Sequence, residues 1–234
     1  DIREIKTESF ADYRCATVAV PLRYDEPERG TLDLHVQMRP AISAEPIGPL
    51  FVNQGGPGAS SAQYSATFST YPELDGFDIV GMDPRGTGSS TRVTCGGADP
   101  PVVEADLPSP DDGSDEVEAA YAAFAAACGG DPVMSVVTTN NTARDMDFLR
   151  GLMGVEQLSY HGKSYGSDLG TAYASLFPER LRVGVFDGVT DLTLDPVDFV
   201  AQQARAGIDS LERYFDECRA EVGSCAWAEG EDPA

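Results

Sequence analysis

The sequence predicts an α/β fold in which a mostly parallel sheet is opened by an antiparallel hairpin. Two alternating segments, 15–24 and 31–41, flank the turn-forming stretch DEPERG, which is the pattern of a hairpin. Short apolar runs that end in Gly- and Pro-rich loops follow at 49–58, 77–86, 158–164 and 182–189. Such runs are typical of parallel strands buried on both faces. Right-handed crossovers would bring the loops that follow these strands to one edge of the sheet, where α/β proteins bind ligands.

Helical patterns separate and follow these runs. Residues 141–154 have Asn141 or Thr142 as the predicted N-cap and Gly154 as a stop signal. The apolar stripe of this helix consists of Met146, Leu149 and Met153. Further helices are predicted at 116–128, 167–177 and from about 195 onward. The Pro- and Asp-rich stretch 96–115 is predicted to be a surface excursion.

Charge and composition exclude several classes of protein. The 234 residues carry 16 Lys and Arg against 39 Asp and Glu, a formal net charge of −23. A field of this sign repels nucleic acid and anionic membranes, so neither is expected as a partner. No apolar run approaches the ~20 residues of a membrane-spanning helix. The chain starts at Asp1, and we expect that an N-terminal signal peptide has been removed.

Five cysteines bear on the cellular compartment: Cys15, Cys95, Cys128, Cys218 and Cys225. None forms a C-x-x-C pair and no histidine is near them in sequence, so no metal site is expected. Cys218 and Cys225 are spaced for a local disulfide, and the others could pair too. The odd count leaves one thiol that could join another chain. This pattern favours a secreted protein, the alternative being buried free thiols in a cytosolic one.

The stretch Gly162-Lys163-Ser164-Tyr165-Gly166 matches G-x-S-x-G. The motif is informative here because a predicted strand enters it and a predicted helix leaves it. In that context Ser164 is the candidate nucleophile, held at a strained turn and at a helix N-terminus that stabilises developing negative charge.

A second motif, GGPG at 55–58, follows the strand that begins near residue 49. An acyl-transfer site needs one N–H group from such a loop and one from the residue after the nucleophile. Pro57 has no N–H group, so Gly56 and Tyr165 are the predicted oxyanion-hole donors.

Four motifs together, NQGGPGASS, FDIVGMDPRGTGSSTRVTC, YHGKSYGSDLGTAYASLFPERL and FDGV, resemble the secreted actinobacterial tripeptidyl aminopeptidases, which are α/β-hydrolases related to proline iminopeptidases. The resemblance runs from about Cys15 to the last residue and corresponds to the N-terminal portion of these enzymes. It implies a hydrolase core at 1–190, the beginning of a helical cap at 191–234, and final core strands outside this chain. It also implies cleavage of short peptides from a free N-terminus through an acyl-enzyme on Ser164, without a cofactor.

The same resemblance places the catalytic acid and histidine beyond the cap. The two histidines of the chain are predicted to have other roles: His161 precedes the serine on its own strand, and His35 belongs to the hairpin. We therefore expect a second polypeptide, the C-terminal part of the same precursor, to supply Asp and His, the alternative being a truncated chain. Asp187 is an alternative triad acid. Asp83 and Arg85 are expected to form a structural ion pair.

The substrate is less well determined by the sequence. A free α-ammonium group would be bound by carboxylates, and the eligible residues of the cap segment are Asp198, Glu212, Asp216 and Glu217. Two other functions remain open. One is an esterase, lactonase or amidase that acts on a small metabolite with the same fold, and the other is an inactive or binding fragment.

Overall fold

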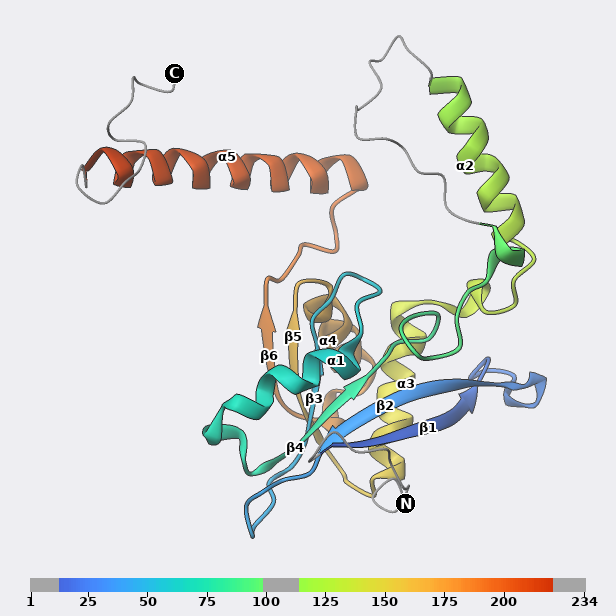
Figure 1. The fold of residues 1–234 in the computed structure, drawn as a ribbon, viewed down its shortest axis with the longest axis vertical. Coiled ribbons are helices and arrows are strands. Elements are labelled where there is room, and N and C mark those ends of the chain that lie inside the picture. Colours follow the sequence, from blue (N-terminus) through green and yellow to red (C-terminus); the bar gives the residue numbers. More distant parts are fainter. Residues whose placement is uncertain (1–12, 99–113, 221–234) are drawn as a thin grey trace. The chain divides into compact units, whose positions relative to one another are not determined.

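The structure, a computed structural model, describes residues 13–98 and 114–220 (Figure 1). These residues contain one six-stranded sheet with the order β1-β2-β4-β3-β5-β6. The strands are β1 (Arg14–Pro21), β2 (Thr31–Arg39), β3 (Gly48–Asn53), β4 (Phe77–Met82), β5 (Leu158–Lys163) and β6 (Leu181–Asp187). The pairs β1/β2 and β2/β4 are antiparallel, whereas β3/β4, β3/β5 and β5/β6 are parallel. The predicted mixed sheet with an opening hairpin is thereby confirmed.

Alternation of apolar and polar residues along β2 explains why these residues form a hairpin with one buried face. The inward residues of β2 are buried against the core and its other residues are more exposed, so one face of this strand pair packs and the other meets solvent. These inward residues are Leu32, Leu34, Val36 and Met38. Strands β3 and β4 are buried along most of their length, as the unbroken apolar runs predict.

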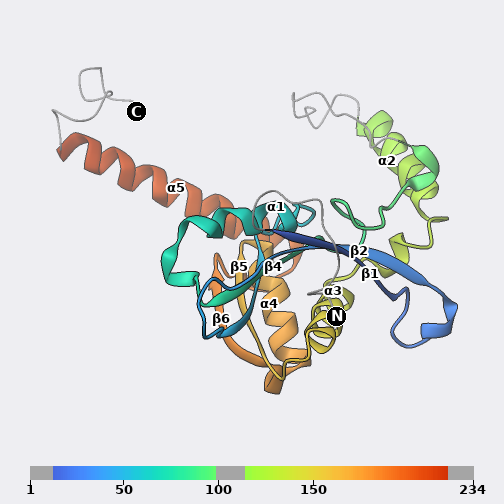
Figure 2. The same ribbon diagram turned by 60° about the horizontal axis from the view of Figure 1, so that its bottom comes forward.

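Helices cover both faces of the sheet (Figure 2). On one face lies α1 (Ser61–Ser65), which packs with η3 (Ala66–Thr70) over a small core that includes Phe68 and Ile79. On the other face lie α3 (Thr139–Leu152) and α4 (Tyr165–Leu176), which enclose the larger core. The predicted stripe of Met146, Leu149 and Met153 is buried there.

The helix boundaries differ from those predicted by at most two residues. Helix α3 begins at Thr139, and its N-cap is Thr138, whose hydroxyl accepts the N–H of Asn141 at 3.2 Å. The predicted caps, Asn141 or Thr142, were therefore wrong by one turn or less, because Thr138 offers the same capping oxygen earlier in the chain. Helix α2 is Ser114–Cys128, and α5 is Pro196–Ala220.

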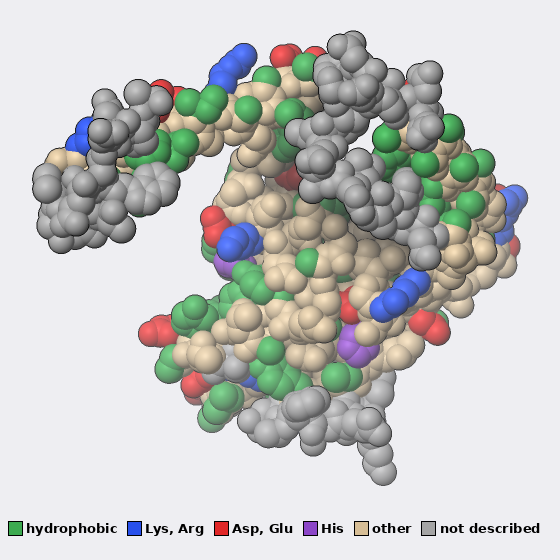
Figure 3. Space-filling view, turned by 45° about the horizontal axis from the view of Figure 1, so that its top comes forward, with side chains coloured by type: hydrophobic (Ala, Val, Ile, Leu, Met, Phe, Trp, Pro, Cys, Tyr) green, Lys and Arg blue, Asp and Glu red, His purple; other side chains and the backbone are tan. Residues whose placement is uncertain are grey.

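The chain divides into two compact units, Asp1–Thr190 and Asp191–Ala234. The second unit is the segment in which we predict the beginning of a helical cap. Helix α5 of that unit carries exposed apolar side chains, which Figure 3 shows along the helix. None of the described helices is both long and apolar enough to cross a membrane.

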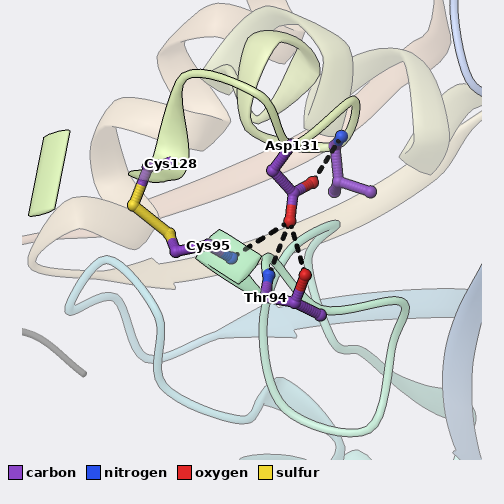
Figure 4. Close-up of a disulfide and its surroundings, with 5 residues drawn as sticks. Thr94, Cys95, Cys128 and Asp131 are labelled. Carbon is purple, nitrogen blue, oxygen red and sulfur yellow. Dashed lines mark hydrogen bonds between the residues drawn. A yellow bond between two sulfur atoms is a disulfide. The ribbon is translucent and has the colours of Figure 1, made fainter. Parts of the chain in front are cut away.

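A disulfide joins Cys95 to Cys128, the last residue of α2 (Figure 4). Most of the predicted surface excursion, 99–113, lies outside the described residues. Asp131 lies beside it, and its carboxylate accepts N–H groups from Thr94, Cys95 and Val133. Cys218 is also disulfide-bonded, whereas its expected partner lies outside the described residues. Among the cysteines that the structure describes, Cys15 on the edge strand β1 is a half-buried free thiol.

Candidate active site

Ser164 lies at the predicted turn between β5 and α4, at the carboxyl end of the strand. Its φ of 54° and ψ of −130° put it in a region that residues other than glycine rarely occupy. Such strain costs of order 1–3 kcal/mol and persists only where the surroundings hold the residue in place. Here the N–H of Ser164 donates to the carbonyl of Asp187 at 2.7 Å, and its carbonyl accepts the N–H of Ser167 at 2.7 Å. The side chain remains exposed.

The two glycines of the motif are required by close packing. A Cβ on Gly162 would lie 2.2 Å from the carbonyl oxygen of Gly166, and one on Gly166 would lie 2.3 Å from the carbonyl oxygen of Asn53. Contacts of this kind with backbone atoms leave no room for a side chain at either position. The strand and the helix can therefore approach closely enough to form the sharp turn that exposes Ser164.

The GGPG loop packs directly against this turn. An added Cβ on Gly55 would lie 2.8 Å from the nitrogen of Tyr165 and 3.1 Å from Cβ of Ser164. The N–H group of Gly55 is already occupied, because it donates to Oδ1 of Asn53 at 2.9 Å. In contrast, the N–H groups of Gly56 and Tyr165 donate no hydrogen bond to any described residue. The two predicted oxyanion donors thus lie on neighbouring segments with their hydrogens unused.

Two buried polar residues hold these loops; sequence reasoning missed Asn53 and assigned Asp83 a different partner. Asn53, at the end of β3, bonds to Gly55 as described and donates from Nδ2 to Oγ of Ser61 at 2.8 Å. Asp83, just after β4, accepts from Oγ of Ser60 at 2.8 Å and from the N–H of Ala62 at 3.0 Å. Their position at strand ends was a usable signal, since polar residues directly after buried strands lie at the ligand-binding edge.

The expected ion pair between Asp83 and Arg85 is absent, which corrects that prediction. Asp83 is occupied by the α1 N-terminus and by the N–H of Ser89, and Arg85 turns into the core. There Arg85 contacts both carboxylate oxygens of Asp145 on α3, at 2.6 and 2.8 Å. The hydroxyl of Tyr24 donates to the same carboxylate at 2.7 Å. Burial raises the pKa of Asp145, and the hydrogen bonds from Arg85 and Tyr24 oppose that rise.

His161 points to the face of the sheet covered by α1 and η3. Its ring lies edge-on to Phe68, with centroids 5.2 Å apart, and Nδ1 is buried without a hydrogen-bond partner among the described residues. Burial lowers its pKa, and the negative charge of Asp187 partly offsets this effect. No hydrogen bond links its ring to Ser164 within the described part of the chain. His35 lies on β2, where its backbone bonds to the loop after β4.

Asp187 ends β6, next to the nucleophile. Its backbone carbonyl accepts from both the N–H of Ser164 and Oγ of Ser167, while its side chain is exposed. The four candidate carboxylates for a substrate amine all lie exposed on α5, in the second unit: Asp198, Glu212, Asp216 and Glu217. The described residues include no cluster of three or more potential metal ligands.

Comparisons with known proteins identify a family and several relatives. A family model described as alpha/beta hydrolase fold matches residues 48–224. The serine protease Hip1 of Mycobacterium tuberculosis is 35% identical over 94% of this chain and 44% of its own length. The tripeptidyl aminopeptidase of Streptomyces coelicolor is 33% identical over 80% of this chain and 37% of its own length. Carboxylesterase B of Mycobacterium tuberculosis is 35% identical over 93% of this chain and 43% of its own length. The chain therefore spans less than half the length of these curated relatives.

Proposed function

The chain belongs to the α/β-hydrolase family, and we propose that it is the nucleophile-bearing part of a serine hydrolase that cleaves short peptides from a free N-terminus. The observation that carries the proposal is the exposed, strained Ser164 beside the unused N–H groups of Gly56 and Tyr165. Its similarity to proteins named serine protease and tripeptidyl aminopeptidase favours a peptide as the substrate.

In the proposed reaction, Oγ of Ser164 attacks the scissile carbonyl while a histidine takes the hydroxyl proton. The N–H groups of Gly56 and Tyr165 stabilise the oxyanion of the tetrahedral intermediate, an interaction whose loss typically costs about 10²–10³ in rate. The histidine then gives its proton to the leaving amine, and the acyl group stays on Ser164 until water releases it. Asp187 would serve as the triad acid only if the partner segment supplied a histidine without its own acid.

The histidine and acid would come from the C-terminal part of the same precursor. Strand β6 supports this, because it is a sheet edge whose Val183 and Val185 are 51% and 53% exposed on the side of the sheet that carries His161. A strand of this kind is a ready template for further pairing. The length of the relatives, more than twice this chain, supports it further.

We also propose that the protein acts outside the cytosol. The disulfide between Cys95 and Cys128 supports this location, since disulfides form and persist in oxidising compartments.

Covalent labelling tests the nucleophile. A fluorophosphonate should label the native protein on Ser164, and Ser164→Ala should abolish labelling. Ser175→Ala is the matched control, because Ser175 is an exposed serine on the same helix whose hydroxyl bonds to the carbonyl of Thr171. Equal labelling of Ser164→Ala and the wild type would contradict the assignment, and absent labelling would favour an inactive or binding fragment.

Substrate panels test the reaction. Tripeptide p-nitroanilides with a free amine should be hydrolysed, and the same compounds with an acetylated N-terminus should be poor substrates. Equal hydrolysis of both would contradict the exopeptidase assignment. The relative named carboxylesterase B favours a second candidate, an esterase, which would cleave p-nitrophenyl acyl esters and none of the anilides.

The masses of the native and of the denatured, reduced protein test whether a second polypeptide is present. A native particle well above 24.9 kDa that separates under denaturing, reducing conditions into this chain and a histidine-containing second chain would support two polypeptides. A single species of 24.9 kDa with full activity would contradict the need for a partner.

A further inference from the structure

A cavity of about 380 Å³ adjoins the turn that carries the nucleophile, and nothing so far assigns it a role. Its lining includes Tyr165, the residue after Ser164, and Pro57 from the oxyanion loop. The other walls are Pro84 after β4 and the segment around the start of α3, represented by Val137, Thr139 and Thr142. These six residues are called the acyl pocket below. A volume of this size is within the range of small-molecule sites.

The lining of the cavity contains no charged side chain that is available to bind a ligand. Arg85 contributes to the wall, but its guanidinium is fully buried and bound to Asp145. No carboxylate and no lysine lines the cavity. A charged group that entered it would lose its hydration without gaining a counter-charge, which is unfavourable.

The hydroxyl groups of the lining are also largely occupied by one another and by the backbone. Thr142 donates to the carbonyl of Thr138 at 3.2 Å, and Thr87 donates to the carbonyl of Pro84 at 2.9 Å. Thr139 and Tyr165 share one hydrogen bond, 3.0 Å between their hydroxyl oxygens. Two lining hydroxyl groups keep a hydrogen to donate: Thr138, which accepts the N–H of Asn141, and the partner that accepts in the Thr139–Tyr165 pair. The rest of the wall presents methyl groups, proline rings and an aromatic ring.

The pocket lies on a definite side of the nucleophile. Strand β5, which carries Ser164, has β3 and then β4 on one side and β6 on the other. The pocket is built from the loops after β3 and β4 and from α3, so it lies on the side of the oxyanion loop. If the histidine approaches from beyond β6, as proposed above, the leaving group must point toward β6. The acyl side of the substrate then points into the pocket.

We propose that the acyl pocket binds the side chain of the residue on the N-terminal side of the cut, and that it selects uncharged, aliphatic side chains. This inference rests on the proposed serine hydrolase function. Val137 is the aliphatic side chain of this lining: it is 37% exposed, and an added Cβ on Gly86 would lie 2.7 Å from its Cγ2, so it packs against the loop after β4.

The test is the rate at which Ser164 of the native protein is labelled by fluorophosphonates with different groups on phosphorus, which occupy the place of the acyl side chain. An isobutyl group should react about tenfold faster than a methyl group, because it fills the pocket. A carboxyethyl group of similar length should react more slowly than isobutyl. In Val137→Trp the preference for isobutyl over methyl should fall about tenfold.

Val137→Ala widens the pocket and should shift the preference toward groups larger than isobutyl. Because this variant tests the same wall independently, the result does not depend on whether Val137→Trp folds. Leu152→Trp is the matched control, since Leu152 is 46% exposed at the C-terminal end of α3, far from the segment before the helix that carries Val137. If both Val137 variants keep the wild-type preference among the probes while Ser164 is still labelled, the assignment of the acyl pocket is overturned and the proposed serine hydrolase function is not. Failure of every probe to label wild-type Ser164 would overturn the proposed function and this inference with it.

Discussion

The buried contact between Arg85 and Asp145 holds the loop after β4 against α3, and Asp145→Ala should destabilise the protein strongly. Both side chains are fully buried, and the carboxylate accepts from two nitrogens of Arg85 and from Tyr24. Removal of Asp145 would leave a guanidinium in the core with two backbone carbonyls, of Pro21 and Leu22, as its remaining partners.

The size of the effect follows from this geometry. Loss of one partner of a buried ion pair typically costs about 3–5 kcal/mol, because the other charge stays buried and uncompensated. For a chain of this length a loss of 1 kcal/mol lowers Tm by about 2–4 °C, so the expected decrease is roughly 6–20 °C. Tyr24→Phe removes a single hydrogen bond to a charged group and should cost about 1.5–3 kcal/mol.

Urea unfolding at pH 7, followed by circular dichroism, measures these differences as shifts of the midpoint at constant m-value. The decisive comparison is with Arg85→Met/Asp145→Leu, which removes both charges and should cost less than Asp145→Ala alone. The reasoning would be refuted if the double variant were the less stable of the two, or if Asp145→Ala cost less than Tyr24→Phe.

Two further predictions concern backbone packing and acid stability. Gly162→Ala should destabilise the protein and stop phosphonate labelling, because its Cβ would lie 2.2 Å from the carbonyl of Gly166. Gly151 lies in α3 with open space around it, so Gly151→Ala should stabilise the protein by about 0.5–1 kcal/mol. Equal thermal melts of Gly162→Ala and Gly151→Ala would contradict this reasoning. Hydrogen bonds from the backbone of Thr94 and Val133 lower the pKa of Asp131 to about 2. The ionised Asp131 carboxylate therefore contributes fully to the stability of the fold above about pH 4, and this contribution is lost toward pH 2. Asp131→Asn should lower Tm at pH 7, with the difference from wild type shrinking at pH 2; a constant difference would exclude the mechanism.

The sheet was predictable from the sequence because its strands are short-range patterns. Alternation of Leu32, Leu34 and Val36 identifies a half-buried strand, and unbroken apolar runs identify buried ones. The position of Ser164 was predictable for the same reason, since the strand, the motif and the helix are contiguous. The predicted Asp83–Arg85 pair failed because nearness in sequence was used as a guide to nearness in space. Arg85 is 60 residues from Asp145, its actual partner, and no local pattern in the sequence connects them.

The same distinction explains why the acyl pocket could not be predicted. Its walls come from four separate segments, and its chemical character depends on which hydroxyl groups are already occupied. Threonines in a loop would ordinarily indicate a polar site, but Thr142 donates to its own helix and Thr139 bonds to Tyr165. The hydrogen bonds that hold the start of α3 and Tyr165 in place thus also reduce the polarity of the cavity beside them. The positioning of the oxyanion donor at Tyr165 and the preference for aliphatic substrates would then have one structural cause, and Thr139→Val, which breaks that bond, should weaken both together.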